Sequence, residues 1–307
     1  MSPLHRTAQV GAVVGLAIFW SLNWPMMKIG LTVVEPWTFR ALLVVVGAVG
    51  CFAVALALGQ SLAVPKAERI PLLWVGLFQG VLWNAFSGFG IALVEAGRAA
   101  VLAFTMPVWA TLLAVLFLGE AVTARRLTGL AVGMAAMVLL LLPALDALNQ
   151  AALGTLLMLA GAVSWAIATV IVKAANFTIS PLSLAGWQFL IGGIPLTIAA
   201  FAIGKPSTLL DLDAQTGAVV AYSAIMPMVF CQAIFFAIVQ RLPASIASMS
   251  TLMIPPMGVF FSAAILGEKV GVTEIASLAL VVVAMLFILP GFSLRAIRRP
   301  QGASPPG

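Results

Sequence analysis

The sequence predicts an all-α polytopic membrane protein with ten transmembrane helices, arranged as two five-helix repeats of opposite orientation. Three observations carry this prediction: apolar runs near 20 residues recur along the 307-residue chain, only 8% of its residues are charged, and its two halves resemble each other. About 20 helical residues span the roughly 30 Å core of a bilayer. A soluble domain carries about 25% charged residues, so this chain lacks the polar surface that a water-soluble fold needs.

The expected spans follow the apolar runs, and Pro, Gly and charged residues separate them. The first run is long, contains Asn23 and Pro25, and lacks a small-residue cleavage site, so we expect a retained helix rather than a signal peptide. The basic tail, 291–307, is expected to be disordered and cytoplasmic. Two repeats, 9–143 and 153–290, contain the ten spans, which are residues 9–29, 37–58, 70–94, 98–118, 125–143, 153–175, 181–203, 217–240, 243–266 and 271–290.

The internal repeat is clearest near the end of each half, where Ala99–Glu120 matches Ala247–Glu268 at an offset of 148. Because each copy holds five spans, an odd number, the second copy must enter the membrane from the opposite side. Inverted repeats are typical of transporters that expose a central site to each side in turn. The alternative is that duplication only built a stable bundle. Further matched residues are Pro107 with Pro255, Trp20 with Trp165, Lys28 with Lys173, and Pro36 with Pro181.

The basic residues outside the spans favour one side of the membrane. Loops rich in Lys and Arg stay in the cytoplasm, so we expect both termini to be cytoplasmic. The side that holds the termini carries Arg6, Lys66, Arg69, Arg125, Arg126, Lys173, Arg241, Arg295, Arg298 and Arg299, whereas the other side carries Lys28, Arg98, Lys205 and Lys269.

Polar and aromatic side chains collect on the first, third, fourth, sixth, eighth and ninth spans, which we expect to surround a central cavity. A polar amide at membrane depth should face protein or a cavity rather than lipid. The alternatives are close helix packing for the small hydroxyl residues and interfacial anchoring for the tryptophans. The candidate substrate-binding residues are Trp20, Ser21, Asn23, Gln79, Trp83, Asn84, Thr105, Met106, Trp109, Trp165, Thr169, Tyr222, Gln232, Ser248 and Thr251.

The remaining four spans consist mostly of Ala, Val, Leu and Ile, with Gln188 as an exception. We expect them to support the bundle from outside. Three further tryptophans, Trp37, Trp74 and Trp187, lie near span ends or on these outer helices and are expected to be structural.

Prolines interrupt the fourth and ninth spans near mid-membrane, at Pro107 and at Pro255-Pro256. Proline removes a backbone donor and clashes with the preceding turn, so each helix should bend there. The freed carbonyls need partners within the bundle or water in a cavity. We expect the matched bends to act in gating; the alternative is that proline is merely tolerated.

Several absences narrow the function. No Asp or Glu lies in the middle of an expected span, and the only histidine, His5, lies in the N-terminal tail. We therefore expect no metal, no cofactor and no enzyme, since such chemistry in the membrane needs ionisable groups at depth. Cys51 and Cys231 lie within apolar runs and are expected to be packing residues. The net charge of +6 comes from loops and tails and does not indicate nucleic-acid binding.

The cavity itself is expected to be neutral. Arg40, Lys28, Arg98 and Lys173 lie near span ends, and no Arg or Lys is expected to be buried at the site. A neutral cavity lined by aromatic and hydroxyl groups suits a small neutral or zwitterionic solute with an apolar part.

In order and spacing, these features resemble the drug/metabolite transporter superfamily, specifically its EamA-type ten-helix exporters. The resemblance covers residues 9–290 and implies a multi-pass carrier of a bacterial-type inner membrane that exports amino acids or other metabolites. Its expected partners are a small-molecule substrate and the lipid bilayer, and a monomer is an allowed state. The residues that carry the resemblance are Trp20, Lys28, Pro36, Arg40, Pro107 and Gly119-Glu120, with Trp165, Lys173, Pro181, Pro255 and Gly267-Glu268 in the second half.

Within the superfamily, the chain is similar to YddG-type exporters of aromatic and other neutral amino acids. In those proteins tryptophans on the first and sixth helices face the pocket, and Trp20 and Trp165 are the matching positions. The third helix departs from that pattern: it offers no histidine and has Gln79, Trp83 and Asn84 instead. The resemblance implies export of neutral, aromatic or apolar amino acids by alternating access. Alternatives are another metabolite or an apolar drug, such as a purine, a sugar derivative or a cationic drug, and, from a different class, a receptor or an enzyme.

Overall fold

A computed structural model describes residues 3–119, 124–146, 150–241 and 254–288, which are helical apart from their connections. The first half contains α1 (Pro3–Val33), α2 (Pro36–Ala57), α3 (Arg69–Val75), the π-helical segment η2 (Gly76–Leu82), α4 (Trp83–Leu93), α5 (Ala96–Ala103), α6 (Met106–Leu118) and α7 (Ala124–Asp146). The second half contains α8 (Gln150–Ala175), α9 (Pro181–Ala202), α10 (Ala214–Ile225), the π-helical segment η4 (Met226–Cys231), α11 (Gln232–Arg241), α13 (Ile254–Leu266) and α14 (Val272–Ile288).

Six described helices are long and apolar enough to cross a membrane, which confirms a polytopic α-helical membrane protein. Large apolar side chains also point outward, such as Phe117, Phe201 and Val49, which are 74%, 76% and 64% exposed. Such a surface suits contact with lipid. The six helices run over Pro36–Ala57, Lys66–Leu93, Ala96–Leu118, Ala152–Ala175, Pro181–Ala202 and Ala214–Ile238; shorter apolar helices cover Leu127–Ala136, Met257–Leu266 and Val272–Ala284.

Corresponding helices in the two halves begin and end with the same devices. Both α2 and α9 begin with proline, directly after a residue whose side chain accepts hydrogen bonds from the first-turn N–H groups. These capping residues are Glu35 and Ser180. Both α6 and α13 end at a glycine with positive φ, 64° at Gly119 and 67° at Gly267, a conformation that costs glycine nothing. Each device leaves fewer helix-end groups unpaired inside the bundle.

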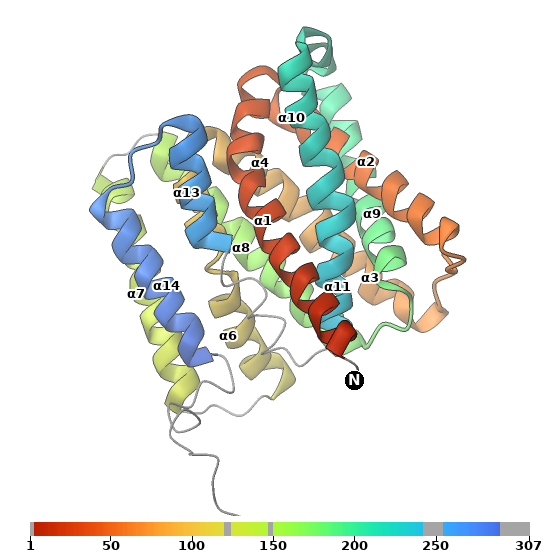
Figure 1. Ribbon diagram of the computed structural model, residues 1–307, viewed down its shortest axis with the longest axis horizontal. Coiled ribbons are helices and arrows are strands. Elements are labelled where there is room, and N and C mark those ends of the chain that lie inside the picture. The colour runs from red at the N-terminus through yellow and green to blue at the C-terminus, as the bar shows by residue number, and fades with distance from the viewer. Residues whose placement is uncertain (1–2, 120–123, 147–149, 242–253, 289–307) are drawn as a thin grey trace, which may run out of the picture.

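The helices pack in pairs that each take one member from each half. These pairs are α2 with α9, α7 with α14, α4 with α8, and α1 with α13. Figure 1 shows α7 and α14 side by side at one edge, and α1 among α10, α11 and α13. The interior of the protein therefore lies at the interface between the two halves.

The expected fourth span, 98–118, is two helices. α5 ends at Ala103, Phe104 and Thr105 form a turn, and Pro107 is the second residue of α6. Proline is favoured in the first turn, where no intrahelical donor is lost. Pro255 likewise is the second residue of α13, followed by Pro256. The candidate residues Ser248 and Thr251 fall outside the described residues.

One close contact between the halves is made by backbone alone. A Cβ atom added to Gly192 of α9 would lie 2.4 Å from the carbonyl carbon of Gly80 in η2, and one added to Gly80 would lie 2.4 Å from the carbonyl oxygen of Gln188. Only glycine fits at both positions. Gln79 and Gln188 lie beside this contact, since Gln79 directly precedes Gly80 and Gln188 lies one turn before Gly192.

We expect Gly192→Ala to lower the free energy of unfolding by about 1–3 kcal/mol, because the added methyl group must push two backbones apart. Gly193→Ala is the matched control: its Cβ would meet the nearest side-chain atom, Val44 Cγ2, at an ordinary 3.5 Å. Thermal unfolding of both variants in detergent measures the difference. Equal midpoints for the two variants would contradict the tight contact.

Candidate functional site

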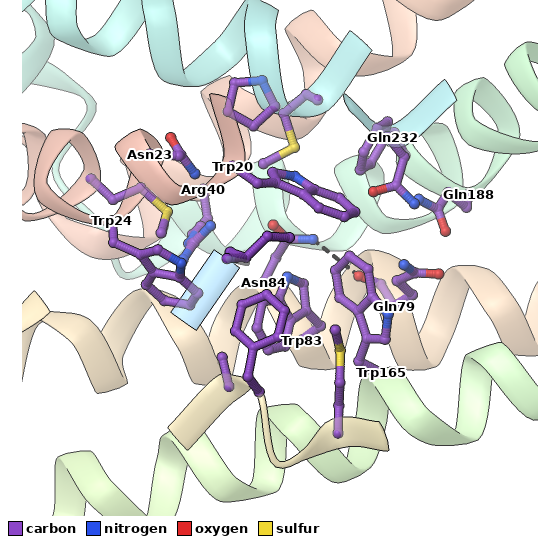
Figure 2. Close-up of a pocket in the computed structure, with 18 residues that line it drawn as sticks. Trp20, Asn23, Trp24, Arg40, Gln79, Trp83, Asn84, Trp165, Gln188 and Gln232 are labelled. Atoms are coloured by element: carbon purple, nitrogen blue, oxygen red, sulfur yellow. Dashed lines mark hydrogen bonds between the residues drawn. The ribbon is translucent and has the colours of Figure 1, made fainter. Parts of the chain in front are cut away.

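A cavity lies between the two halves (Figure 2). The elements that line it are α1, α2, η2, α4, α8, α9, η4, α11 and α13, together with the end of α5, the start of α6 and the turn between them. Of the sequence-predicted candidates, the structure brings eight together here: Trp20, Asn23, Gln79, Trp83, Asn84, Met106, Trp165 and Gln232. Lining residues that the sequence did not indicate include Trp24, Met27, Arg40, Phe104, Gln188, Phe189 and Met228.

One wall of the cavity is aromatic and centres on Trp165 of α8. Its ring centroid lies 4.9 Å from that of Trp83, 5.9 Å from that of Trp20 and 5.7 Å from that of Phe235. Trp20 and Phe235 are also 5.4 Å apart. Most of these contacts are edge-to-face, the arrangement that aromatic quadrupoles favour. The wall thus joins α1 and α4 of the first half to α8 and α11 of the second.

Amide side chains with unpaired polar atoms face the cavity. Five described residues of the cavity lining have buried amide atoms without a hydrogen-bond partner: Asn23 Oδ1, Asn84 Oδ1, both amide atoms of Gln79 and of Gln188, and Gln232 Nε2. Leaving a buried polar group unsatisfied costs about 1–3 kcal/mol, so native proteins rarely do it without a reason. Five such residues around one cavity indicate a place where water or a polar ligand completes the hydrogen bonds.

Two π-helical segments, η2 and η4, sit at the same place in their respective halves and both border the cavity. The sequence predicted continuous α-helices here. The wider turn shifts the register by one residue, so Asn84 Nδ2 donates to the carbonyl oxygens of Gln79 (3.1 Å) and Gly80 (2.9 Å). That shift places Gln79, Trp83 and Asn84 together on the cavity side. Single π-turns inside α-helices often occur at functional sites.

The expectation of a neutral cavity without buried Arg or Lys is wrong. Arg40 of α2 is 1% exposed and lines the cavity. The sequence placed it near a span end by counting along its own helix. However, α2 packs against α4 at Gly88, and a Cβ atom added to Gly88 would lie 2.8 Å from Arg40 Cγ. The missing side chain of Gly88 makes room for the arginine to run inward between the helices.

The assignment of the second and seventh spans to an outer layer also needs correction. Arg40 of α2, and Gln188 and Phe189 of α9, reach the cavity, because α2 and α9 pack against each other beneath it. Gln188, the one polar residue noted in an otherwise apolar span, was the signal that could have indicated this. Trp74 is half exposed, and Trp187 Nε1 donates to the carbonyl oxygen of Leu62 (2.8 Å), away from the cavity.

Several candidate residues lie outside the cavity lining because their hydroxyl groups bond to backbone carbonyls. Ser21 Oγ donates to Ile254 O (3.1 Å) and joins α1 to α13, and Tyr222 Oη donates to Phe19 O (2.9 Å) and joins α10 to α1. Thr105 and Thr169 bond to carbonyls of their own helices, those of Leu102 and Trp165. Trp109 and Pro255 likewise do not line the cavity, and the side chains of Pro107 and Pro256 fall outside the described part of the structure.

A charged cluster lies at the face where α1 ends. Lys28 Nζ donates to the carbonyl oxygens of Ile91 (2.8 Å) and Val94 (2.5 Å) at the end of α4. Glu268, from the second half, accepts from Ala96 N (2.7 Å) and Gly97 N (2.9 Å) at the start of α5. A cation at a helix C-terminus and an anion at a helix N-terminus are the favourable placements. The cluster ties the α4–α5 turn to α1 and to the other half.

Comparisons with known proteins agree with this architecture. A model of the EamA-like transporter family matches twice, over residues 8–142 and 152–289. The chain is 24% identical to the uncharacterized transporter YoaV of Bacillus subtilis (strain 168), covering 93% of this chain and 98% of that one. It is 25% identical to a "probable amino-acid metabolite efflux pump" of Salmonella typhimurium (94% and 96% covered). A solved crystal structure of a protein shares the fold, with a TM-score of 0.64 at 19% identity over 92% of this chain and 98% of that one.

A titration test follows from Glu95, which stands between α4 and α5 in the charged cluster. Burial and the nearby carboxylates of Glu268 and Glu274 raise the pKa of Glu95, while Arg98 and Lys28 oppose the shift. A raised carboxyl pKa means that the folded state binds the proton more tightly than the unfolded state does. Ionised Glu95 therefore destabilises the fold at pH values above the pKa it has in the folded state, and this effect is absent at pH values below the pKa it has in the unfolded state. We expect Glu95→Gln to raise the melting temperature near pH 7, with the gain vanishing toward about pH 4.

Asp213→Asn is the control, because the pKa of Asp213 is shifted in the opposite direction and the substitution should lower the melting temperature near pH 7. The Asp213 carboxylate accepts from Thr216 N (2.7 Å) and caps α10, which lowers the pKa of Asp213. Its contribution to stability is therefore present near neutral pH and lost as the pH falls through its folded pKa. Thermal unfolding from pH 4 to pH 8 measures both. A gain for Glu95→Gln that is independent of pH would contradict the shifted carboxyl.

Proposed function

Since the chain belongs to the EamA-like transporter family, we propose that it exports small neutral amino acids with aromatic or apolar side chains by alternating access. The observation that carries this proposal is the cavity between the two halves, whose aromatic wall and unpaired amides can hold an apolar side chain and polar groups together. Some relatives are named as amino-acid metabolite efflux pumps, which supports the same substrate class. The binding residues proposed are those sequence candidates that line the cavity.

The proposed topology has ten transmembrane helices in two inverted five-helix repeats, 9–143 and 153–290. Both termini would be cytoplasmic, in a bacterial-type inner membrane. The matched caps of α2 and α9, the matched π-segments and the pairing of helices across the halves support the repeat. In transporters with inverted repeats, the two repeats move against each other, and this motion opens a central site first to one side of the membrane and then to the other.

Gating is proposed to occur at the two prolines. The turn between α5 and α6 contributes Phe104 to the cavity lining, and α13 contributes Ile254 beside Pro255. A helix break next to the ligand lets its two parts move separately. At the face where α1 ends, the bonds from Lys28 and Glu268 to the α4–α5 turn would have to rearrange when that face opens.

A second candidate substrate is a purine or another flat heterocycle. The three indole rings offer aromatic faces and edges, and paired amide donors and acceptors on Gln79 and Gln188 suit the edge of a nucleobase. Including purines in the same flux panel separates the two candidates.

We expect Trp165→Ala to reduce saturable uptake of labelled phenylalanine or tryptophan into proteoliposomes by about tenfold or more, since it removes the centre of the aromatic wall. Trp74→Ala is the matched control, because Trp74 is half exposed and stacks on Phe78 away from the cavity. Initial rates over a range of concentrations give the measurement. If neither amino acids nor purines show saturable flux, the substrate assignment is wrong.

We expect Pro107→Ala to slow turnover several-fold while the dissociation constant for the substrate stays within about twofold, since the substitution lets α5 and α6 join into a stiffer helix. Pro195→Ala, at a proline inside α9, is the matched control. Stopped-flow flux and equilibrium binding on the same preparations separate the two effects. An unchanged turnover number in Pro107→Ala would count against gating at this break.

A further inference from the structure

Among the described residues that line the cavity, Arg40 alone carries a charge. Its guanidinium group is buried, Nη2 donates to Ser87 Oγ (2.9 Å), and Nε has no partner among the described residues. A buried charge in a membrane protein is costly and marks a functional site by default. One neutral hydroxyl does not offset that cost.

The described part of the chain supplies no counter-charge for Arg40. The acidic residue nearest to it in sequence, Glu35, is occupied at the start of α2, where its carboxylate accepts from Trp37 N (2.9 Å) and Thr38 N (3.1 Å). The charge is therefore left for a molecule that enters the cavity.

The guanidinium group is held in place by α4. Ser87 Oγ donates to Trp83 O (2.6 Å), which directs its oxygen lone pairs toward Arg40. Gly88, the next residue, leaves the space that the arginine stem occupies. A guanidinium fixed on one edge presents its remaining N–H groups as a planar fork, the geometry that binds both oxygens of a carboxylate.

Other polar groups of the cavity lie where they could bind a second group of a ligand whose carboxylate pairs with Arg40. In Figure 2, Arg40 and Asn23 lie on one side of Trp20, and Gln188 and Gln232 lie on the other. The unpaired oxygens Asn23 Oδ1 and Asn84 Oδ1 are acceptors that an ammonium group could use. Neither oxygen carries the negative charge that would neutralise the arginine.

We propose that Arg40 forms an ion pair with a carboxylate of the transported molecule, so that a carboxylate is required of every substrate. This inference rests on the proposed role of the cavity in transport and deepens it. It disfavours a cationic drug, whose charge would meet a buried charge of the same sign, and a purine, which lacks the anionic group. The apolar part of the substrate then lies against Trp20, Trp83 and Trp165.

The test is equilibrium binding to the purified full-length protein by calorimetry, with pairs of probes that differ only in the carboxylate. The pairs are L-phenylalanine with L-phenylalaninamide, 3-phenylpropionate with its amide, and phenylpyruvate with its amide. We expect the wild-type protein to bind at least one carboxylate about 10- to 100-fold more tightly than its amide, the range for charged hydrogen bonds. Arg40→Gln should lose that preference, and Arg40→Lys should keep part of it.

The control is Arg69→Gln, since Arg69 is exposed outside the cavity and its removal should leave the preference unchanged. Size-exclusion profiles and ligand-free melting curves establish that each variant is folded; if Arg40→Gln is not, Arg40→Lys and the wild-type preference still decide. Equal binding of acid and amide by the wild type, an unchanged preference in Arg40→Gln, or no bound carboxylate in the panel would each overturn the proposal. Carboxylates that bind but are not carried across liposomes would instead overturn the transport function and leave the ion pair standing.

Discussion

Every polar group inside a membrane-embedded protein must find its partner within the protein, because lipid offers none. This constraint is most severe where helices stop. At the turn between α4 and α5 one helix ends and the next begins, so both leave backbone groups without intrahelical partners. Lys28 donates to free carbonyl oxygens at the end of α4, and Glu268 accepts from free N–H groups at the start of α5. Side chains from elsewhere thus take the place of missing backbone partners at this turn, and one of them, Glu268, comes from the other half of the chain.

The cavity is where this rule is broken. Hydroxyl groups that could have faced it, such as those of Ser21 and Tyr222, are bonded to carbonyls and serve helix packing. The long amides and Arg40 are left with unpaired atoms. These atoms lie at the interface of the two halves, where each unsatisfied group costs stability. Water or a polar ligand in the cavity would complete their hydrogen bonds.

The sequence predicted the class, the repeat and much of the aromatic wall, because these depend on composition and spacing. Asn23, Gln79 and Trp165 could be found since polar or aromatic residues at membrane depth have few other uses. Arg40 could not be placed, because its depth depends on the sideways contact with Gly88 and not on its position along α2. The π-segments could not be foreseen either, since a shift from one hydrogen-bonding register to the next leaves little trace in apolar periodicity.

The contact between Gly80 and Gly192 has a mechanical meaning. Two backbones that touch without side chains between them cannot slide past each other by changing rotamers, and they cannot separate without opening a void. A relative motion of η2 and α9 that keeps this contact closed would turn the two segments about Gly80 and Gly192, with the pair as the fulcrum. A fulcrum beside Gln79 and Gln188 would keep one end of the cavity almost stationary while the distant ends of the helices swing through larger arcs.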